Sequence, residues 1–241
     1  MQYLRQVYRF KGPFAVFLLA ISGWALPHQL LSQSIDNKLF IIKSSSQYRA
    51  WLSQNEGLQL VAIKEIIKPL YQEVIYATPN NFTQQKLYKN PTLYLCLEAA
   101  NQLKRVQDSL LTIGLSILVF DAYRPYSITQ KMWKIVPDER YAANPKNGSG
   151  HNRGVSIDLT LAYATTGKAL EMPTGFDHFT DSAHHGFTGI SPEKAANRDL
   201  LKGIMEHFGF VALSTEWWHY SLPNAKRFPL LNLSFKKLRK L

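Results

Sequence analysis

The chain is poor in cysteine, since Cys96 is the only one among its 241 residues. A single thiol cannot form an internal disulfide bond, and it excludes metal clusters built from several thiolates. Cys96 lies among apolar residues at helical spacing, which favours a buried thiol with a structural role.

The sequence also lacks an apolar run long enough to cross a membrane comfortably, which takes about 20 residues. Residues 13–25, PFAVFLLAISGWA, are apolar but short, and residues 1–12 before them carry three basic residues and no acidic one. This pattern is typical of a secretory signal peptide. We expect cleavage after Ala25 and export to the periplasm, with an uncleaved N-terminal membrane anchor as the alternative.

Acidic residues are absent from residues 225–241, which carry six basic ones. The whole chain has a formal net charge of +11, and residues 1–25 account for three of these charges, so the mature chain would carry +8. Residues 226–241 are interpreted as a basic C-terminal tail that is either simply solvated or in contact with peptidoglycan or other anionic envelope material. An exported protein rarely meets nucleic acid, so no nucleic-acid partner is expected.

The composition is otherwise that of an ordinary globular protein, with 46% hydrophobic and 19% charged residues. We find no internal repeat and no low-complexity linker, which favours one domain. The chain is therefore divided into four parts: a signal peptide at 1–25, an N-terminal extension at 26–60, an enzymatic domain at 61–225, and the basic tail at 226–241.

The apolar spacing of the central part indicates a mixture of helices and strands. Three segments have the pattern of helices: residues 92–114, 127–136 and 191–209. Three others are typical of strands: residues 115–120, 154–163 and 210–222. Because the order shows no regular alternation of strand and helix, we expect a single α+β domain in which helices flank a small antiparallel sheet.

The strongest chemical signal lies in the segment SGHNRGVSIDLTL. His151 and Asp158 are seven residues apart, and Gly154 between them permits a sharp bend where the loop enters a strand. Imidazole nitrogen and carboxylate oxygen are both good zinc ligands. Two such residues also occur together by chance, so this pair alone does not establish a metal site.

The segment STEWWHYSL, residues 214–222, supplies further candidates in His219 and Glu216. With His219 as a third ligand, zinc keeps one position for water, which is typical of a catalytic site, and a nearby Glu can act as general base. No H-E-x-x-H motif occurs. Positions 216 and 219 face opposite sides of a regular strand, so the chain around Trp217 and Trp218 must bend.

Arg124, in the segment FDAYRPYS, is a candidate for stabilising an oxyanion. It follows directly after a predicted buried strand, and the next residue, Pro125, stiffens the turn. The alternative is an arginine in a surface loop.

Six segments share their order and about their spacing with one enzyme family: DAYRP, SGHNRGVSIDLTL, EMPTGFDHF, HHGFTGIS, NRDLLKGIMEHFGF and EWWHY. On these segments, the chain resembles the D-alanyl-D-alanine dipeptidases of the vancomycin-resistance type, which are zinc enzymes related to D,D-carboxypeptidases. The resemblance runs from about Tyr76 to Tyr220. Its pattern S-x-H-x-x-G-x-x-x-D followed by E-x-W-H is specific.

The resemblance implies one zinc ion (Zn2+) per chain, held by His151, Asp158 and His219. It also implies that Glu216 is the general base acting on a zinc-bound water and that Arg124 stabilises the tetrahedral intermediate. The sheet of the α+β domain would then carry the zinc site.

The resemblance further implies a small closed pocket for D-Ala-D-Ala or a related small D-peptide. The substrate-binding positions of the family fall on Tyr76, Ser149 and Asp177, and Asp121 would orient Arg124. A free dipeptide has an ammonium and a carboxylate group, and Asp177 suits the ammonium. A peptide that lacks either group would leave buried polar side chains unpaired, which excludes longer substrates.

Two features depart from the resistance enzymes. The loop at residues 134–150 is shorter, which would open the pocket, and the chain carries an export signal. Two alternatives to a D,D-dipeptidase therefore remain. One is a zinc D,D-carboxypeptidase or endopeptidase that trims peptidoglycan peptides, and the other is a non-catalytic envelope-binding module.

Overall fold

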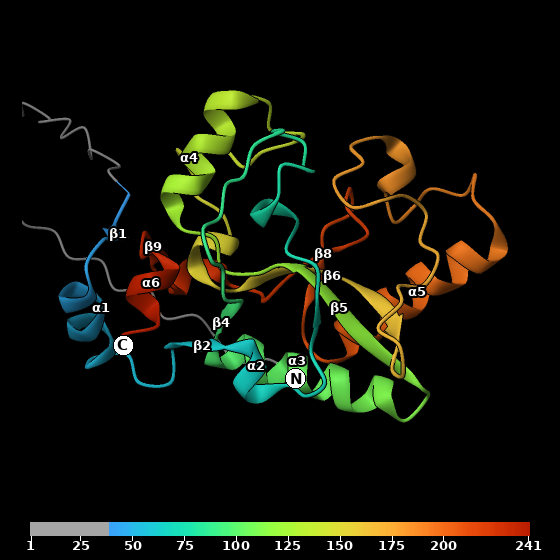
Figure 1. Cartoon of the computed structure of the whole chain (residues 1–241), viewed down its shortest axis with the longest axis horizontal. Helices are drawn as coiled ribbons and strands as arrows, with labels where there is room; N and C mark the ends of the chain where they lie inside the picture. Colours follow the sequence, from blue (N-terminus) through green and yellow to red (C-terminus); the bar gives the residue numbers. More distant parts are fainter. Residues whose placement is uncertain (1–38) are drawn as a thin grey trace, which may run out of the picture. The chain divides into compact units, whose positions relative to one another are not determined.

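The computed structural model describes residues 39–241 (Figure 1). The predicted signal peptide and residues 26–38 of the predicted N-terminal extension lie outside these residues. Within residues 39–241, no helix is long and apolar enough to span a membrane.

A five-stranded sheet with the strand order β3-β5-β6-β8-β7 forms the centre of the described chain. Its strands are β3 (Tyr71–Gln72), β5 (Leu115–Asp121), β6 (Ser156–Tyr163), β7 (Val211–Ala212) and β8 (His219–Ser221). Neighbouring strands are antiparallel except at one edge, where β3 runs parallel to β5. The predicted α+β class is confirmed, and the parallel edge strand is an addition to it.

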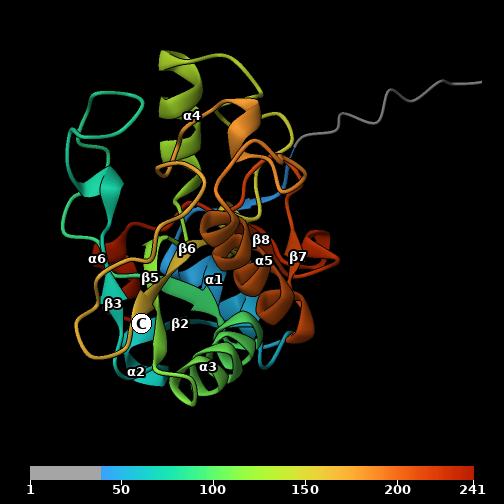
Figure 2. The same ribbon diagram turned by 90° about the vertical axis from the view of Figure 1, so that its right-hand side faces the viewer.

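Three longer helices surround this sheet: α3 (Leu97–Leu111), α4 (Tyr126–Ile135) and α5 (Pro192–His207). Helix α3 packs against β5 and α5, so these two helices cover the same side of the sheet (Figure 2). Helix α4 lies on the other side in both views. The apolar residues of α3 at helical spacing, from Ala99 to Leu110, are fully buried. The amphipathic pattern of this segment therefore faces the core, as we expected.

The predicted helix at residues 92–114 begins later than its pattern suggested. Residues 94–96 form the short strand β4 (Tyr94–Cys96), which pairs with β2 (Leu60–Ala62). Cys96 then caps α3, because its thiol accepts a hydrogen bond from the Ala99 amide. Burial raises the pKa of this thiol to about 11, so Cys96 is an inert structural residue.

The segments interpreted as an N-terminal extension and a basic tail pack together. Strand β1 (Ile41–Ile42) pairs in parallel with β9 (Leu230–Leu231). Helix α6 (Phe235–Leu238) follows β9, and α1 (Ser45–Leu52) follows β1. Apolar side chains of all four elements join one buried cluster. Residues 226–241 therefore pack against the rest of the described chain, because their apolar side chains enter this cluster between the basic ones.

The remaining short elements connect these parts. They are α2 (Ile63–Ile66) and the single 3-10 turns η1 (Ile75–Ala77), η2 (His151–Arg153), η3 (Asp181–Ala183) and η4 (Ala225–Arg227). No regular element occurs between α4 and η2, where residues 136–150 form the predicted loop.

Candidate metal centre and active site

Two aspartates and one histidine lie side by side on three neighbouring strands of the sheet. Asp158 on β6 lies directly opposite His219 on β8, and Asp121 at the end of β5 lies opposite Asp158. A register shift after Val119 produces this alignment. Residues that face each other across antiparallel strands point to the same side of the sheet, so the three side chains share one surface.

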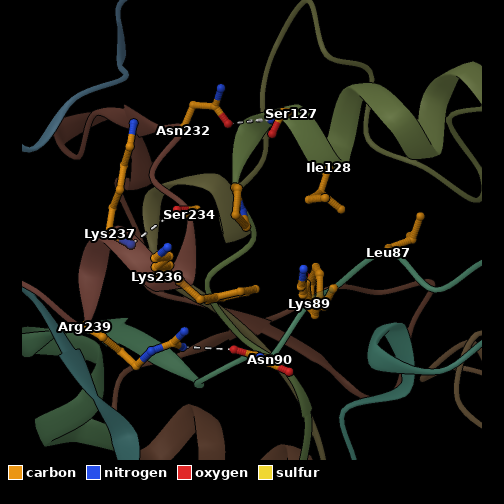
Figure 3. Close-up of a pocket in the computed structure, with 13 residues that line it drawn as sticks. Leu87, Lys89, Asn90, Ser127, Ile128, Asn232, Ser234, Lys236, Lys237 and Arg239 are labelled. Carbon is orange, nitrogen blue, oxygen red and sulfur yellow. Dashed lines mark hydrogen bonds between the residues drawn. The ribbon is translucent and has the colours of Figure 1, made fainter.

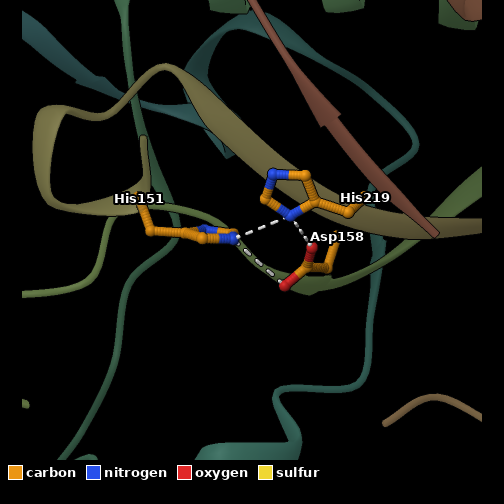
Figure 4. A group of neighbouring side chains, drawn as sticks. All are labelled: His151, Asp158 and His219. Atoms are coloured by element: carbon orange, nitrogen blue, oxygen red, sulfur yellow. Dashed lines mark hydrogen bonds and ion pairs between the residues drawn. The ribbon is translucent and has the colours of Figure 1, made fainter. Parts of the chain in front are cut away.

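His151, Asp158 and His219 form a compact cluster (Figure 4). His219 Nδ1 lies 2.9 Å from Asp158 Oδ1, and His151 Nε2 lies 3.3 Å from Asp158 Oδ2. The two imidazole nitrogens are 3.3 Å apart. One ligand atom from each residue fits within 4.8 Å of the others, which suits a single metal ion.

Hydrogen bonds orient both imidazole rings. His151 Nδ1 lies 2.7 Å from the carbonyl oxygen of Ala122, to which it can only donate, so Nε2 keeps its lone pair for a metal. His219 turns Nδ1 towards the cluster, and its Nε2 lies 3.2 Å from Ser221 Oγ. In each ring, a hydrogen bond thus fixes the nitrogen that points away from the cluster.

Gly154 shapes the turn between His151 and β6. Its φ of +68° is in the left-handed region, and a Cβ atom there would lie 2.3 Å from a methyl group of Leu60. The turn η2 can therefore close tightly before the strand, as predicted from the glycine.

The segment after β7 bends sharply before β8 begins. The Glu216 amide donates to the carbonyl of Leu213, and the His219 amide donates to the carbonyl of Glu216. Because of this bend, Glu216 and His219 face the same space, and Glu216 Oε2 lies 3.9 Å from His219 Nδ1. The segment at 210–222 is therefore two short strands joined by a turn, rather than one strand.

Trp217 and Trp218 are nearly fully buried, with ring centroids 5.3 Å apart. The indole N–H of Trp217 donates to Thr174 Oγ1, while Trp218 lines the cavity beside the cluster and packs against Phe176. Apolar rings against the cluster exclude water, and they strengthen the electrostatic interactions within it.

Arg124 is 7% exposed and is held by a chain of hydrogen bonds. Its Nε and Nη2 both donate to Asp121 Oδ2, at 3.0 and 2.8 Å. Tyr88 in turn donates its hydroxyl to Asp121 Oδ1 at 2.8 Å. The guanidinium lies 4.0 Å from Asp158 and above the ring of Tyr76. Asp121 therefore fixes Arg124 beside the cluster of His151, Asp158 and His219, which agrees with the role that the resemblance implied, whereas Tyr88 was not foreseen.

Asp177 and Tyr76 meet on another wall of the cavity. The hydroxyl of Tyr76 donates to both carboxylate oxygens of Asp177, at 3.0 and 3.2 Å. Ser149 lies on the wall near His151, and its hydroxyl accepts a hydrogen bond from the Asn152 amide.

One cavity of about 280 Å³ joins these residues. It is lined by eight of the nine predicted site residues: Tyr76, Arg124, Ser149, His151, Asp158, Asp177, Glu216 and His219. The ninth, Asp121, lies behind Arg124. Glu139 and Tyr141 also line the cavity, and no sequence signal pointed to them because they belong to an irregular loop. This loop, expected to leave the pocket open, forms part of its wall.

Burial and charge shift the acidities of the clustered groups. Burial opposes ionisation of Asp158, but the two imidazoles outweigh it and hold the pKa of this carboxyl well below its usual range. Burial opposes protonation of His219 as well, yet the hydrogen bond to Asp158 raises its pKa. Burial raises the pKa of Glu216 and, more strongly, that of Asp177. Perturbed groups gathered in one cavity are typical of an active site.

Comparisons with known proteins point to one family. Residues 56–239 match the family profile described as D-ala-D-ala dipeptidase. The D-alanyl-D-alanine dipeptidase of Escherichia coli is 36% identical over 177 residues, which cover 73% of this chain and 91% of the relative. The D-alanyl-D-alanine dipeptidase of Enterococcus faecium is 33% identical and covers 66% of this chain and 89% of its own length. A solved structure of VanYB in complex with D-Alanine-D-Alanine aligns with a TM-score of 0.37 and 14% identity over 58% of this chain and 77% of its own.

Proposed function

The chain belongs to the D-ala-D-ala dipeptidase family of metallopeptidases, and we propose that it hydrolyses the free dipeptide D-Ala-D-Ala in a zinc-dependent reaction. The observation that carries this proposal is the single small cavity in which the metal-binding cluster faces Glu216, Arg124 and Asp177.

The donor set fits zinc. Two imidazole nitrogens and one carboxylate oxygen are typical ligands of catalytic zinc, and three protein ligands leave a position for water. His151 Nε2 and His219 Nδ1 face Asp158, while the other nitrogen of each ring is hydrogen-bonded elsewhere. When bound, zinc lowers the pKa of a coordinated water and polarises the peptide carbonyl.

Glu216 is the general base of the proposed reaction. Its carboxylate lies 3.9 Å from His219 Nδ1 and lines the cavity, so it can take the proton of an attacking water and deliver it to the leaving amine. The raised pKa of Glu216, which burial causes, makes this carboxylate a stronger base than an exposed one. Arg124, fixed by Asp121, stabilises the negative charge that develops on the carbonyl oxygen.

The cavity recognises both ends of a dipeptide. Asp177, which is half-buried and hydrogen-bonded by the neutral Tyr76 hydroxyl, gains a counter-charge when it binds the substrate ammonium. Ser149, next to His151, offers a hydroxyl to the substrate's polar groups. A volume of about 280 Å³ lies at the lower end for ligand pockets, which start at roughly 300 Å³, so a dipeptide suits it better than a long peptide.

One observation favours a second candidate function, that of a D,D-carboxypeptidase or endopeptidase acting on peptidoglycan peptides. A neighbouring cavity of about 520 Å³ shares Glu139, Tyr141 and Glu216 with the first. It offers room for the remainder of a longer peptide.

Relative activity on the free and on the N-blocked dipeptide distinguishes a dipeptidase from a carboxypeptidase or endopeptidase. We expect zinc-loaded protein to cleave D-Ala-D-Ala, and to cleave N-acetyl-D-Ala-D-Ala and intact muropeptides at least 100-fold more slowly in kcat/KM. The Asp177→Asn variant should lose most of its activity on the free dipeptide and little of the residual activity on the blocked one. Cleavage of the blocked peptide at a comparable rate would favour the carboxypeptidase, and no turnover of any substrate would favour the non-catalytic envelope-binding module.

We also propose that the protein is exported to the periplasm. This proposal rests on the basic and apolar pattern of residues 1–25. Fractionation of cells that express the full chain tests it, because N-terminal sequencing of the periplasmic protein should start at residue 26 if cleavage follows Ala25.

A further inference from the structure

A second cavity lies between three segments of the chain, away from the cluster of His151, Asp158 and His219 (Figure 3). We name it the basic groove. Its volume is about 490 Å³, and its walls come from residues 87–90, residues 125–128 and residues 232–239. The last of these segments is part of the basic tail described above.

Among residues 39–241, no acidic side chain lines the basic groove, and four cationic ones do: Lys89, Lys236, Lys237 and Arg239. Their hydrogen bonds go to uncharged oxygens. Arg239 Nη1 donates to the carbonyl of Asn90 at 3.0 Å, and Lys237 Nζ donates to the carbonyl of Lys43 at 3.2 Å. The groove therefore concentrates positive charge without a carboxylate to neutralise it.

The sequence around the groove explains this excess of positive charge. The three walls come from three stretches that contain no Asp or Glu, residues 74–97, 122–137 and 217–241. These stretches carry eleven basic residues together. Four of these eleven residues line the groove, from the first and third stretches, whereas Arg124 is paired with Asp121 and Arg227 with Glu98.

The first turn of helix α4 also faces the groove, through Pro125, Ser127 and Ile128. The Ser127 amide already donates to Asn232 Oδ1 and the Ile128 amide to the carbonyl of Pro125, so this helix end contributes only its partial positive charge to the attraction of anions. Lysine and arginine side chains are further typical ligands of phosphate. The chemistry of the basic groove is therefore that of a phosphate site.

Exposed apolar residues flank the elements that form the tail side of the groove. Phe40, directly before β1, is 69% exposed, and Leu241, shortly after α6, is 49% exposed. Strand β1 pairs with β9, which leads into α6. Leu241 follows Arg239 by two residues, and an exposed leucine close to cations is suited to the interface of a membrane, where apolar groups enter and basic groups meet lipid phosphates.

We propose that the basic groove binds phosphate headgroups of an anionic membrane surface. The described chain begins just before β1, next to this surface, and the preceding residues 1–38 contain the basic and apolar stretch expected to enter the export pathway. Binding through the groove needs neither zinc nor turnover, so it stands independently of the proposed hydrolysis.

The test measures partitioning of the full chain onto vesicles of phosphatidylglycerol and of phosphatidylcholine. Residues 1–38, with their basic residues, are the same in wild type and variants, so the groove accounts for the difference between wild type and variants on phosphatidylglycerol. The Lys236→Gln/Lys237→Gln variant should reduce partitioning onto phosphatidylglycerol by roughly 25-fold, since each basic residue near an anionic surface contributes about fivefold. Lys89→Gln, from another wall, should reduce it by about fivefold.

A matched control is Lys64→Gln/Lys168→Gln, which removes two exposed lysines that do not line the groove. It should leave partitioning nearly unchanged, and all variants should keep the wild-type thermal unfolding temperature and the activity on D-Ala-D-Ala. Equal losses in groove and control variants, or equal binding of wild type to both lipids, would overturn the proposal. So would groove variants that lose binding of inorganic pyrophosphate but keep wild-type binding to phosphatidylglycerol vesicles.

Discussion

At the scale of single residues, we predict that metal binding and proton transfer depend on different side chains. His151, Asp158 and His219 form the cluster, whereas Glu216 lies beside it. The Glu216→Gln variant should keep one zinc per chain and lose roughly 10²- to 10⁴-fold in kcat, the usual contribution of general acid–base catalysis. Metal analysis by mass spectrometry and steady-state kinetics on D-Ala-D-Ala measure both quantities.

The matched control is His219→Ala, which removes one of the three proposed ligands and should lose both zinc and activity. Zinc loss in Glu216→Gln would make Glu216 a ligand instead of a base. Turnover near the wild-type level in this variant would show that another group takes the proton.

The sequence pointed to the three residues that the structure brings together, because motif and chemistry coincide. The turn at Gly154 and the short spacing place His151 and Asp158 together, and the segment STEWWHYSL offered His219 and Glu216, to which the family resemblance gave their roles. The supporting residues had no such signal. Tyr88 reaches Asp121 across 33 positions. Hydrogen bonds between distant segments follow from the fold and leave no local pattern.

At the scale of elements, the turn η2 couples fold stability to the metal cluster. In Gly154→Ala, the new methyl group would meet Leu60 at 2.3 Å while the backbone keeps a φ of +68°. We expect the free energy of unfolding to fall by about 2–4 kcal/mol, because the left-handed conformation and the steric conflict both destabilise the folded state. Zinc affinity should fall at the same time, because η2 carries His151. Urea denaturation and zinc titration measure the two effects.

Gly114→Ala is the control for this substitution, since Gly114 has a φ of +75° but no heavy atom within 4 Å of the point where a Cβ atom would lie. This variant should lower the free energy of unfolding by about 1–2 kcal/mol, from the left-handed conformation alone. Its zinc affinity should be unchanged. Equal losses of zinc affinity in both variants would contradict a special role of η2.

Element boundaries were less predictable than element types. Residues 94–96 have apolar spacing compatible with α3, but β2 offers them a strand partner, and Cys96 caps the helix only after this strand. Residues 210–222 are rich in strand-forming side chains, yet the turn that holds Glu216 interrupts them. In both places, a distant partner decides the backbone conformation, which local propensity cannot indicate.

At the scale of the whole molecule, the ends of the described chain were the part least predictable from the sequence. Residues 226–241 have the pattern of a solvated tail because six basic residues dominate them. Their apolar residues, such as Leu231 and Phe235, instead join Ile42 and Tyr48 in a second buried cluster. The two segments are nearly 200 residues apart, and the pairing of β1 with β9 leaves no trace in either segment alone.

The two clusters lead to the last prediction, which concerns stability without metal. Both cores consist of apolar residues outside the metal site, so the protein should stay folded when a chelator removes zinc. Zinc at 100 times its Kd should add about 2.7 kcal/mol to the free energy of unfolding, which corresponds to roughly 5–10 °C in Tm for a domain of this size. Calorimetry with zinc and with chelator measures the shift. His219→Ala should show no shift between the two conditions, because its ligand set is incomplete. An unfolded metal-free protein would mean that zinc holds η2, β6 and β8 together as part of the fold, and an equal Tm in wild type would contradict metal binding by the cluster.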